Sequence, residues 1–250
     1  MSGDENMQNN LIELFSSIQG EGKYAGCRQV FVRFEGCNLC CNYCDTQHDP
    51  GTHAYCDVEK HAGSRKFEHV SNPISSGDLA GYVNILLHDL PHQAIALTGG
   101  EPLLHADFIH EIAPLMHAPV MLETNGTLCA ELKKVIDDIS IVSMDIKLPS
   151  VTGRELWAEH TEFLRMARRK DIYVKVVVSN DTTDDEFDKA VSVVSNASGA
   201  RTLFVIQPVT PVNGVEAITP DRTLQLQARA LRSLRDVRVL PQTQKMINQM

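Results

Sequence analysis

The chain has 250 residues, 43% of them hydrophobic, and a formal net charge of −9 at pH 7. This acidic balance argues against a nucleic-acid-binding surface, which needs a basic patch. No apolar run reaches the length of a transmembrane helix, and the polar, acidic N-terminus does not resemble a signal peptide. With seven cysteines and no export signal, we expect a cytoplasmic protein in which residues 1–250 form a single domain without a membrane partner.

The first predicted strand, Val30–Phe34, leads into a loop with the spacing Cys37-x3-Cys41-x2-Cys44. Three thiolates can bind three irons of a four-iron, four-sulfur cluster, whereas four cysteines would occupy all of its corners. The remaining iron then keeps an open position, as catalytic metal sites do and closed structural sites do not. The spacing therefore predicts a [4Fe-4S] cluster with one open iron, which can bind a small molecule and transfer one electron to it.

Cys40 allows a second interpretation of this loop, because Cys37/Cys40 and Cys41/Cys44 form two abutting CxxC pairs. Four such cysteines are enough for a structural zinc ion, although zinc modules usually separate their pairs by about a dozen residues or more. Cys40 and Cys41 are neighbours and tend to point in different directions. A non-catalytic zinc or iron–sulfur binding module is therefore the alternative, and on the cluster interpretation Cys40 is dispensable.

The segment 45–76 contains four histidines, Cys56, several glycines and prolines, and little apolar periodicity. We interpret it as a loop-rich insertion that closes over the cysteine loop, since long loops in compact domains are usually lids or binding elements. A second metal site made of Cys56 and the histidines is the alternative. Their spacing fits no compact ligand motif.

After this insertion the chain alternates predicted helices and strands. Ser75-x-x-Asp78 begins an amphipathic helix, and Thr183-x-x-Glu186 has the form of a capping box. Apolar runs typical of parallel strands recur at Val30–Phe34, Ala94–Leu97, Val120–Glu123, Ile139–Met144, Val174–Val178 and Leu203–Ile206. This alternation predicts right-handed βα units and a parallel sheet, two units short of an eightfold barrel.

Polar residues follow four of these strands. Thr98-Gly-Gly-Glu-Pro102 places two glycines at a strand end, where the backbone can approach a ligand closely. Glu123-Thr-Asn-Gly126, Ser143-Met-Asp-Ile-Lys147 and Gln207-Pro-Val-Thr210 end three more strands. Ligands bind at the carboxyl ends of parallel strands, so we expect these segments to meet at one active edge.

The cysteine loop and Thr98–Pro102 together resemble the signature of the radical S-adenosylmethionine (SAM) enzymes. Phe15–Gly22 (FSSIQGEG), the stretch GCNLxCxYCDT from Gly36, and Leu240–Lys245 narrow this to a resemblance to the 7-carboxy-7-deazaguanine synthase (QueE) family, over most of the chain. The resemblance implies an α/β fold, a modified, incomplete radical SAM β/α barrel with about six parallel strands, and a homodimer. It also implies a carbon–nitrogen lyase that contracts 6-carboxy-5,6,7,8-tetrahydropterin to 7-carboxy-7-deazaguanine with release of ammonia, in 7-deazapurine (queuosine, archaeosine or preQ0) biosynthesis.

The resemblance also implies site residues. The pterin would be bound by Ile18, Gln19, Gly20, Arg33, Thr98 and the terminal Met250. SAM would be bound by Gly100, Glu101, Ser143, Met144, Asp145, Gln207, Pro208, Val209 and Thr210. The cluster would be bound by Cys37, Cys41 and Cys44, and Mg²⁺ by Thr46.

Several of these roles also follow from the chemistry of the residues. Arg33 suits the pterin carboxylate, because a guanidinium can pair bidentately with a carboxylate. The hydroxyl of Thr46 is an oxygen donor of the kind that Mg²⁺ accepts, although it could equally stabilise a turn after Asp45. Glu123 is either an acid–base participant or a hydrogen-bonding prop. This chain has Gln244 where the family often has histidine.

The partners follow from the same resemblance: a small pterin substrate and an electron donor such as flavodoxin or ferredoxin. A glycyl-radical activating enzyme is the alternative among enzymes, because it shares the cysteine motif but acts on a protein. The FSSIQGEG segment and Arg33, which suit a small anionic substrate, argue against it.

Overall fold

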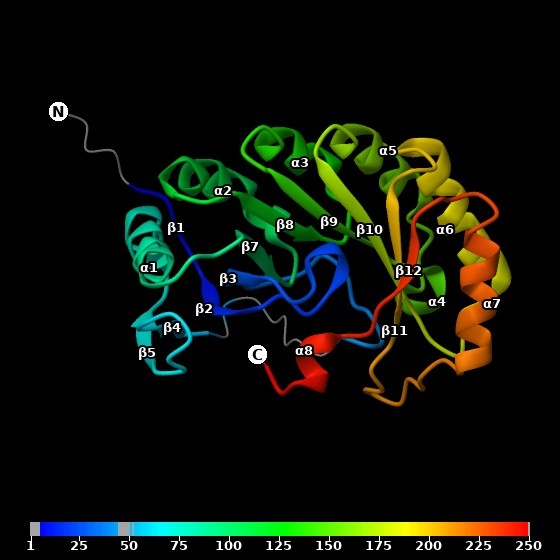
Figure 1. Ribbon diagram of the computed structural model, residues 1–250. Helices are drawn as coiled ribbons and strands as arrows, with labels where there is room; N and C mark the ends of the chain where they lie inside the picture. The colour runs from blue at the N-terminus through cyan, green and yellow to red at the C-terminus, as the bar shows by residue number, and fades with distance from the viewer. Residues whose placement is uncertain (1–5, 45–50, 52, 250) are drawn as a thin grey trace.

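A curved sheet of ten strands forms the frame of the computed structural model, in the order β12-β11-β10-β9-β8-β7-β3-β2-β4-β5 (Figure 1). The structure describes residues 6–44, 51 and 53–249. The strands of this sheet are β2 (Leu11–Ile18), β3 (Arg28–Phe34), β4 (Tyr55–Glu59), β5 (Phe67–Ser71), β7 (Ala94–Gly99), β8 (Val120–Thr124), β9 (Ile141–Ile146), β10 (Asp171–Val178), β11 (Leu203–Pro208) and β12 (Val237–Val239). Two short strands, β1 (Gln8–Asn9) and β6 (Ile74–Ser75), pair separately.

Most of the helices cover the outer face of this sheet, and Figure 1 shows them following its curve, whereas α8 lies apart from them. The α-helices are α1 (Ser76–Asp89), α2 (Ala106–Ile112), α3 (Cys129–Val135), α4 (Pro149–Thr152), α5 (Trp157–Ala167), α6 (Asp184–Ala197), α7 (Pro220–Ala230) and α8 (Thr243–Met246). The 3₁₀ turns are η1 (Gly22–Tyr24), η2 (Pro102–His105) and η3 (Ala113–Leu115). In the described part of the chain, no helix combines the length and apolarity needed to cross a bilayer.

The strands from β3 to β12 pair in parallel, in the order β3, β7, β8, β9, β10, β11, β12. All six strands predicted from the sequence belong to this run, so the expectation of an α/β fold around a mostly parallel sheet is confirmed. The seventh member, β12, spans only three residues, which is too short for a periodic signal. The sheet ends at β12 on one side and at β5 on the other, so it curves without closing as a barrel.

Alternation along these strands separates two environments. Residues on the outer face, such as Val142 and Val174, belong to the main apolar core beneath the helices. Residues on the inner face are apolar at the starts of β8, β9 and β10, where Met121, Ile141 and Tyr173 form a second core cluster. Toward the carboxyl ends the inner face becomes polar, and this is where the cavity described below lies.

The segment 45–76 is more regular than the sequence predicted. Within its described part, β4 and β5 form an antiparallel hairpin that extends the sheet beyond β2. Cys56 is completely buried in the main core, so it packs as an apolar side chain and is not placed to bind a metal with the histidines. The hairpin was missed because its pairing partner, β2, is an N-terminal strand that the sequence did not suggest.

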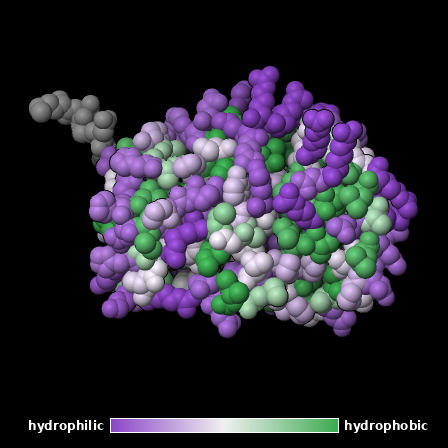
Figure 2. Space-filling model, viewed as in Figure 1, coloured by the Kyte–Doolittle hydropathy of each residue, from purple (hydrophilic) through white to green (hydrophobic). Residues whose placement is uncertain are grey.

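The predicted helix starts are confirmed. The Ser75 hydroxyl accepts the backbone N–H of Asp78 at 3.1 Å. At α6 both halves of the capping box are present: the Thr183 hydroxyl accepts the N–H of Glu186 at 3.3 Å, and the Glu186 carboxylate accepts the N–H of Thr183 at 2.8 Å. The face seen in Figure 2 is mostly hydrophilic with small hydrophobic groups between, as expected for a charged chain.

Candidate active site

The cysteine loop follows β3 and opens onto a cavity of about 620 Å³. Cys37, Cys41 and Cys44 line this cavity, whereas Cys40 is exposed and does not. Among the described residues, no group of three or more Cys, His, Asp or Glu side chains is arranged to hold a single metal ion. Because Cys40 is exposed and does not line the cavity, it is not placed beside the three cavity-facing cysteines as a fourth ligand.

Burial shifts the pKa of two of these thiols. It raises the pKa of Cys37, and it raises the pKa of Cys41 to about 11, although the nearby Lys147 charge opposes the shift. Thiols of this kind stay protonated at neutral pH unless a metal replaces the proton. A loop with three cavity-facing thiols, of which Cys37 and Cys41 need a cation to ionise, fits an iron–sulfur cluster.

Two glycines at the end of β7, Gly99 and Gly100, allow a second loop to pack closely against the cysteine loop. A Cβ on Gly100 would lie 1.8 Å from the carbonyl oxygen of Gly36, so only glycine permits this approach. The N–H of Glu101 then donates to the same Gly36 carbonyl at 2.8 Å. Gly99 and Gly100 both line the cavity beside the cysteines.

Glu101 supports this loop from behind rather than from within the cavity. It is fully buried, and its carboxylate accepts the Thr124 hydroxyl at 2.8 Å and the N–H groups of Asn125 at 2.8 Å and Leu103 at 3.1 Å. Burial raises its pKa to about 7 despite these donors. Its side chain therefore ties β7 to the end of β8, and only its backbone is near the proposed SAM site.

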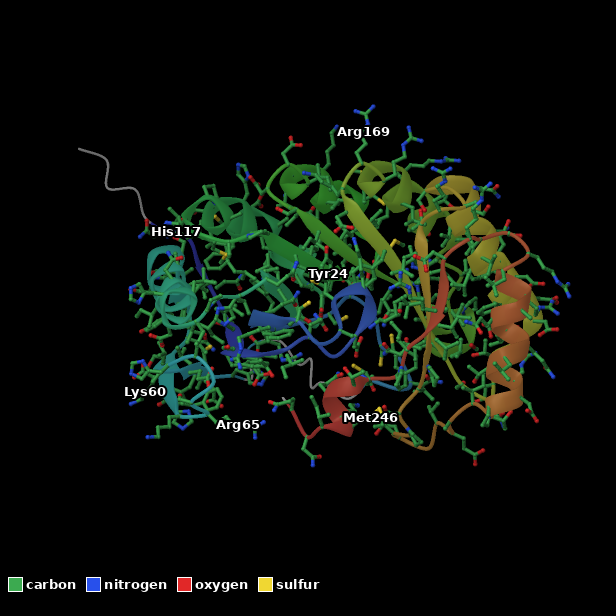
Figure 3. The ribbon with its side chains drawn as sticks, in the orientation of Figure 1. Tyr24, Lys60, Arg65, His117, Arg169 and Met246 are labelled. Carbon is green, nitrogen blue, oxygen red and sulfur yellow. The ribbon has the colours of Figure 1, made fainter. Side chains whose placement is uncertain are left out.

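The FSSIQGEG segment begins as the end of β2, and its second half leaves the sheet as a turn that lies within the curve (Figure 1). Gly22, with φ of +66°, packs so tightly on Tyr173 that a Cβ would lie 2.1 Å from the ring. Figure 3 shows Tyr24, the last residue of η1, within the curve of the sheet. This segment thus forms the floor of the cavity, and Ile18, Gln19 and Gly20 line it.

Glu123 connects three elements of the cavity wall. Its carboxylate accepts the side-chain amide of Gln19 and the hydroxyl of Thr98, both at 2.7 Å. Gln19 also donates to Gln29 at 3.0 Å. Both oxygens of Glu123 therefore accept hydrogen bonds from residues expected to contact the pterin. This geometry fits a carboxylate that positions Gln19 and Thr98, and it also fits a carboxylate oriented for acid–base chemistry.

A chain of largely buried charges runs along another part of the cavity wall. Lys175 pairs with Glu21 and lies 3.5 Å from Asp145, which in turn pairs with Lys147 at 2.8 Å. Burial alone would raise the pKa of Glu21, but the Lys175 charge holds it at about 2. The acidic partners keep the pKa values of both lysines high in spite of burial. Two cations and two anions thus face the cavity with no net charge.

Three acceptors of the cavity lining have no hydrogen-bond partner within the described protein: Asp145 Oδ1 and Gln207 Oε1 in this region, and Gln244 Oε1 in the C-terminal segment. Buried acceptors without partners are costly, so such atoms usually await a ligand or water. Hydroxyl or amino donors, of the kind that a nucleoside carries, fit these positions.

Arg33 and Glu13 form an ion pair on the pterin side, with Nε and Oε1 2.5 Å apart. Both line the cavity, together with the stacked rings of Phe15 and Phe31. The guanidinium expected to bind a substrate carboxylate therefore already has one carboxylate partner, and Glu13 was not suggested by the sequence.

The cavity brings together most of the residues expected from the sequence. Its lining includes Ile18, Gln19, Gly20, Arg33, Thr98, Gly100, Glu123, Ser143, Asp145, Gln207, Val209 and Thr210, with Cys37, Cys41 and Cys44. The exceptions are Pro208, which does not line it, Glu101, and Met144, whose side chain lies in the main core. Met144 occupies the outer face between the cavity-facing Ser143 and Asp145, so only its backbone is near a ligand there. Thr46 and Met250 lie outside the described residues.

Comparison with known proteins decides the family. The radical SAM superfamily model matches residues 31–194. A 7-carboxy-7-deazaguanine synthase from Geobacter sulfurreducens is 42% identical over 246 residues, which cover 96% of this chain and 97% of the relative. The chain belongs to the 7-carboxy-7-deazaguanine synthase family. A synthase from Archaeoglobus fulgidus is 35% identical, with 96% of this chain and 98% of the relative covered.

Solved structures agree on the fold of this synthase family member. The crystal structure of QueE from Escherichia coli has a TM-score of 0.60 at 18% identity, with 95% of each chain covered. A radical SAM methyltransferase from Sphaerobacter thermophilus has a TM-score of 0.59 at 10% identity, with 92% of this chain and 77% of the other covered. Membership of the radical SAM superfamily carries with it the [4Fe-4S] cluster and SAM, and the three cavity-facing cysteines fit the cluster.

The sequence missed several cavity residues, and a few of them had a detectable signal. Lys175 interrupts the apolar strand β10, and Lys147 stands two residues after Asp145 on the same face. Either position indicates a buried charge that needs a partner. The cavity residues Glu21 and Gln242 gave no such signal, because their roles depend on loop packing.

Proposed function

We propose that the chain is a 7-carboxy-7-deazaguanine synthase, a radical SAM lyase that converts 6-carboxy-5,6,7,8-tetrahydropterin to 7-carboxy-7-deazaguanine and ammonia in 7-deazapurine biosynthesis. The observation that carries the proposal is the single cavity that joins the three-cysteine loop to a polar pterin end. Identity of 42% to a relative of that name over 96% of the chain supports the choice of reaction among radical SAM enzymes.

Cys37, Cys41 and Cys44 would hold the cluster, leaving its fourth iron open. Gly100, Ser143, Asp145 and the segment Gln207–Thr210 would bind SAM, with Asp145 Oδ1 and Gln207 Oε1 as acceptors for its donors. When bound, the cluster and SAM supply the one-electron chemistry that removes a hydrogen atom from the substrate. The protein's task is to orient the reacting carbon and to exclude water.

The pterin would lie against Ile18, Gln19 and Gly20, with Arg33 as the partner of its carboxylate. Because Glu13 already pairs with Arg33, we infer that the substrate carboxylate shares the guanidinium with Glu13 or displaces it. Glu123 would orient Gln19 and Thr98 toward the pterin, and it is the carboxylate available for proton transfer at this end.

Further assignments rest on the family resemblance. Thr46 would donate its hydroxyl oxygen to Mg²⁺, Met250 would complete the pterin site, and residues 1–250 would form one domain that pairs as a homodimer. We also propose a cytoplasmic location and reduction by a flavodoxin or ferredoxin, since a labile cluster needs a reducing compartment. Retention of the magnesium response in a Thr46→Ala variant would remove Thr46 from this scheme.

The shape of the cavity favours a small substrate over a protein. The FSSIQGEG segment forms its floor, and Gln242, Gln244 and Gln249 of the C-terminal segment form one wall. A glycyl-radical activating enzyme must admit a loop of another protein. These walls leave a volume of about 620 Å³, which suits SAM and one bicyclic substrate.

The deciding experiment is anaerobic cluster reconstitution followed by SAM cleavage assays with and without the carboxylated pterin. We expect cleavage to accompany conversion of the pterin to a product that has lost ammonia, detected by mass spectrometry. SAM cleavage that is indifferent to the pterin, with no product formed, would overturn the proposed substrate while leaving the radical SAM assignment intact.

A further inference from the structure

The C-terminal segment, residues 242–249, forms one wall of the cavity through Gln242, Gln244, Lys245 and Gln249. Asn248 has φ of +51°, which turns the chain back after α8. The N–H of Gln249 then donates to the carbonyl of Gln244 at 2.9 Å. Figure 1 shows these last residues between α8 and the β4–β5 hairpin.

The start of this wall is attached to the FSSIQGEG segment. The backbone N–H and the hydroxyl of Thr243 both donate to the carbonyl of Gly20 at 2.9 Å. Gln242 donates to Glu21 at 2.8 Å. These contacts hold only the first residues of the segment, and they leave residues 246–249 to be positioned by something else.

That contact comes from Arg65, in the loop of the β4–β5 hairpin. Its Nη2 donates to the carbonyl of Asn248 at 3.2 Å and to Oε1 of Gln249 at 2.9 Å. Among the described residues, Arg65 is the only one outside the C-terminal segment that hydrogen-bonds to residues 246–249. Figure 3 shows Arg65 and Met246 along the same edge of the molecule.

The backbone of Arg65 is fixed by a buried carboxylate. Its N–H donates to Oε1 of Glu59 at 2.7 Å, while Oε2 of Glu59 accepts the N–H of Ser16 at 2.9 Å. Glu59 is only 3% exposed. A buried carboxylate thus joins the hairpin loop to Ser16, which lies both in β2 and in the FSSIQGEG segment. The first residues of the C-terminal wall contact Gly20 directly, and its last residues are connected to Ser16 through Arg65. Both ends of the wall are therefore attached to the FSSIQGEG segment.

We propose that Arg65 is a positioning residue of the active site, which ties residues 248 and 249 to the β4–β5 hairpin and keeps the C-terminal wall closed on the bound substrate. The hairpin lies inside the insertion 45–76, so the proposal also gives this insertion a role. The identity of the substrate rests on the proposed function. The tie itself is a property of the chain alone.

The side chain must be removed without disturbing the turn. Arg65 has φ of +54°, a conformation that asparagine tolerates better than alanine. Arg65→Asn therefore deletes the guanidinium and keeps the loop. Arg65→Lys keeps the charge and one donor, and Lys66→Asn removes a charge from the same loop at an exposed residue with no hydrogen bond to the C-terminal segment.

We expect Arg65→Asn to raise the KM for the carboxylated pterin about fivefold, which corresponds to about 1 kcal/mol, with kcat, iron content and SAM affinity close to those of the parent. An exposed guanidinium that makes two hydrogen bonds supports an effect of this size. Arg65→Lys should recover part of the loss, and Lys66→Asn should match the parent. An unchanged KM in Arg65→Asn would overturn the proposal.

Two further measurements separate a tie from a general loss of structure. Deleting residues 248–250 should raise KM, and Arg65→Asn should add nothing in that background; a full additional effect would contradict the proposal. Without substrate, carboxypeptidase should release the last residues faster from Arg65→Asn than from the parent or Lys66→Asn, and equal rates would also contradict it. If the parent fails to convert the pterin while these rates differ, the proposed function fails and the tie stands.

Discussion

Adjacent residues of the central strands lie in opposite environments. On β9 and β10, Met144 and Val176 are completely buried beneath the helices, whereas Asp145 and Lys175, one step along the same strands, line the cavity. A register slip of one residue would exchange the two sets. The outer face therefore specifies the fold and most of its stability, and the inner face carries the chemistry.

The inner face is itself divided along the strands. Ile141 and Tyr173, near the starts of β9 and β10, belong to an apolar cluster, and the polar residues Ser143 and Lys175 follow two positions later. Because the carboxyl ends of parallel strands meet at one edge, this change concentrates charge and hydrogen-bonding groups where a ligand can reach them. Substitutions on the outer face should therefore lower stability, whereas substitutions on the inner face should lower ligand binding or activity.

The largest contrast is expected in the cysteine loop. Changing Cys37, Cys41 or Cys44 to Ala should abolish bound iron and activity, since each removes a thiolate from the cluster. Cys40→Ala should retain both, because Cys40 is exposed and does not line the cavity. Iron and sulfide analysis of anaerobically purified protein checks this. Stoichiometric zinc that disappears with Cys40→Ala would contradict it.

The outer face should respond in stability. Phe187 on α6 is fully buried and meets Phe204 edge to face, with ring centroids 6.0 Å apart. Phe187→Ala should lower the free energy of unfolding by about 3–5 kcal/mol, through lost burial and the cavity left behind. Urea denaturation measures the change. Leu224→Ala, at a 63% exposed position, is the control and should stay within about 0.5 kcal/mol of the parent.

The corresponding change on the inner face should leave stability nearly intact. Gln207→Ala removes an acceptor that has no partner in the described protein, so the substitution removes little hydrogen bonding from the native state. SAM affinity should fall instead, as equilibrium binding would reveal. A loss of stability as large as that of Phe187→Ala would show that the two faces are not divided as described.

The ion pair between Lys175 and Glu21 is an exception to this division, because it lies on the inner face and should still affect stability. Lys175→Met leaves Glu21 without its main partner, and an unpaired buried charge should cost about 3 kcal/mol of stability, the lower end of the range because the cavity admits water. The double variant Glu21→Gln with Lys175→Met leaves Asp145 and Lys147 as a neutral pair, so most of the stability should return. A double-mutant cycle by urea denaturation tests this, and additive losses would contradict it.

Periodicity predicted the parallel strands because each carries enough consecutive apolar residues to be recognised. It missed β2 and the hairpin. The edge strand of the hairpin, Phe67–Ser71, has only half-buried or exposed residues and lacks a continuous apolar run. The two helix starts were predictable because their capping groups lie within four residues of each other. The insertion's regular structure depends on pairing between segments far apart in the chain.

Motif spacing predicted the cavity-facing cysteines and the polar strand ends. It did not predict that Glu13 pairs with Arg33 or that Arg65 reaches Asn248, since these contacts join residues 20 and 183 positions apart. Nor did it separate Met144 from Ser143 and Asp145. That distinction follows from strand alternation once the bounds of β9 are known.

The smallest expected effect is a pH dependence on the outer face. His160 of α5 is fully buried, and its Nε2 lies 3.1 Å from the carbonyl oxygen of Asn125, to which the neutral ring donates. Burial lowers its pKa from 6.5 to about 4. Between these values the unfolded chain binds a proton that the native protein excludes, so this residue's contribution to stability is complete above pH 6.5 and is lost as the pH falls toward 4.

The full loss is on the order of 3 kcal/mol, since one pH unit of difference corresponds to about 1.4 kcal/mol. Glu101 acts in the opposite direction: its raised pKa of about 7 means that the native protein binds the extra proton, which favours folding at lower pH. The pH profile of the parent is therefore a sum of opposing effects, and only a comparison with a variant isolates the contribution of His160.

His160→Gln keeps a donor for Asn125 but cannot titrate. Urea denaturation between pH 4.5 and 8 should show the variant gaining on the parent as the pH falls below about 6.5, whereas Trp157→Phe, beside the same ring, should change stability equally at every pH. Parallel curves for His160→Gln and the parent would mean that His160 accepts its proton in the native state, and that the packing of α5 over the sheet is looser than the structure indicates.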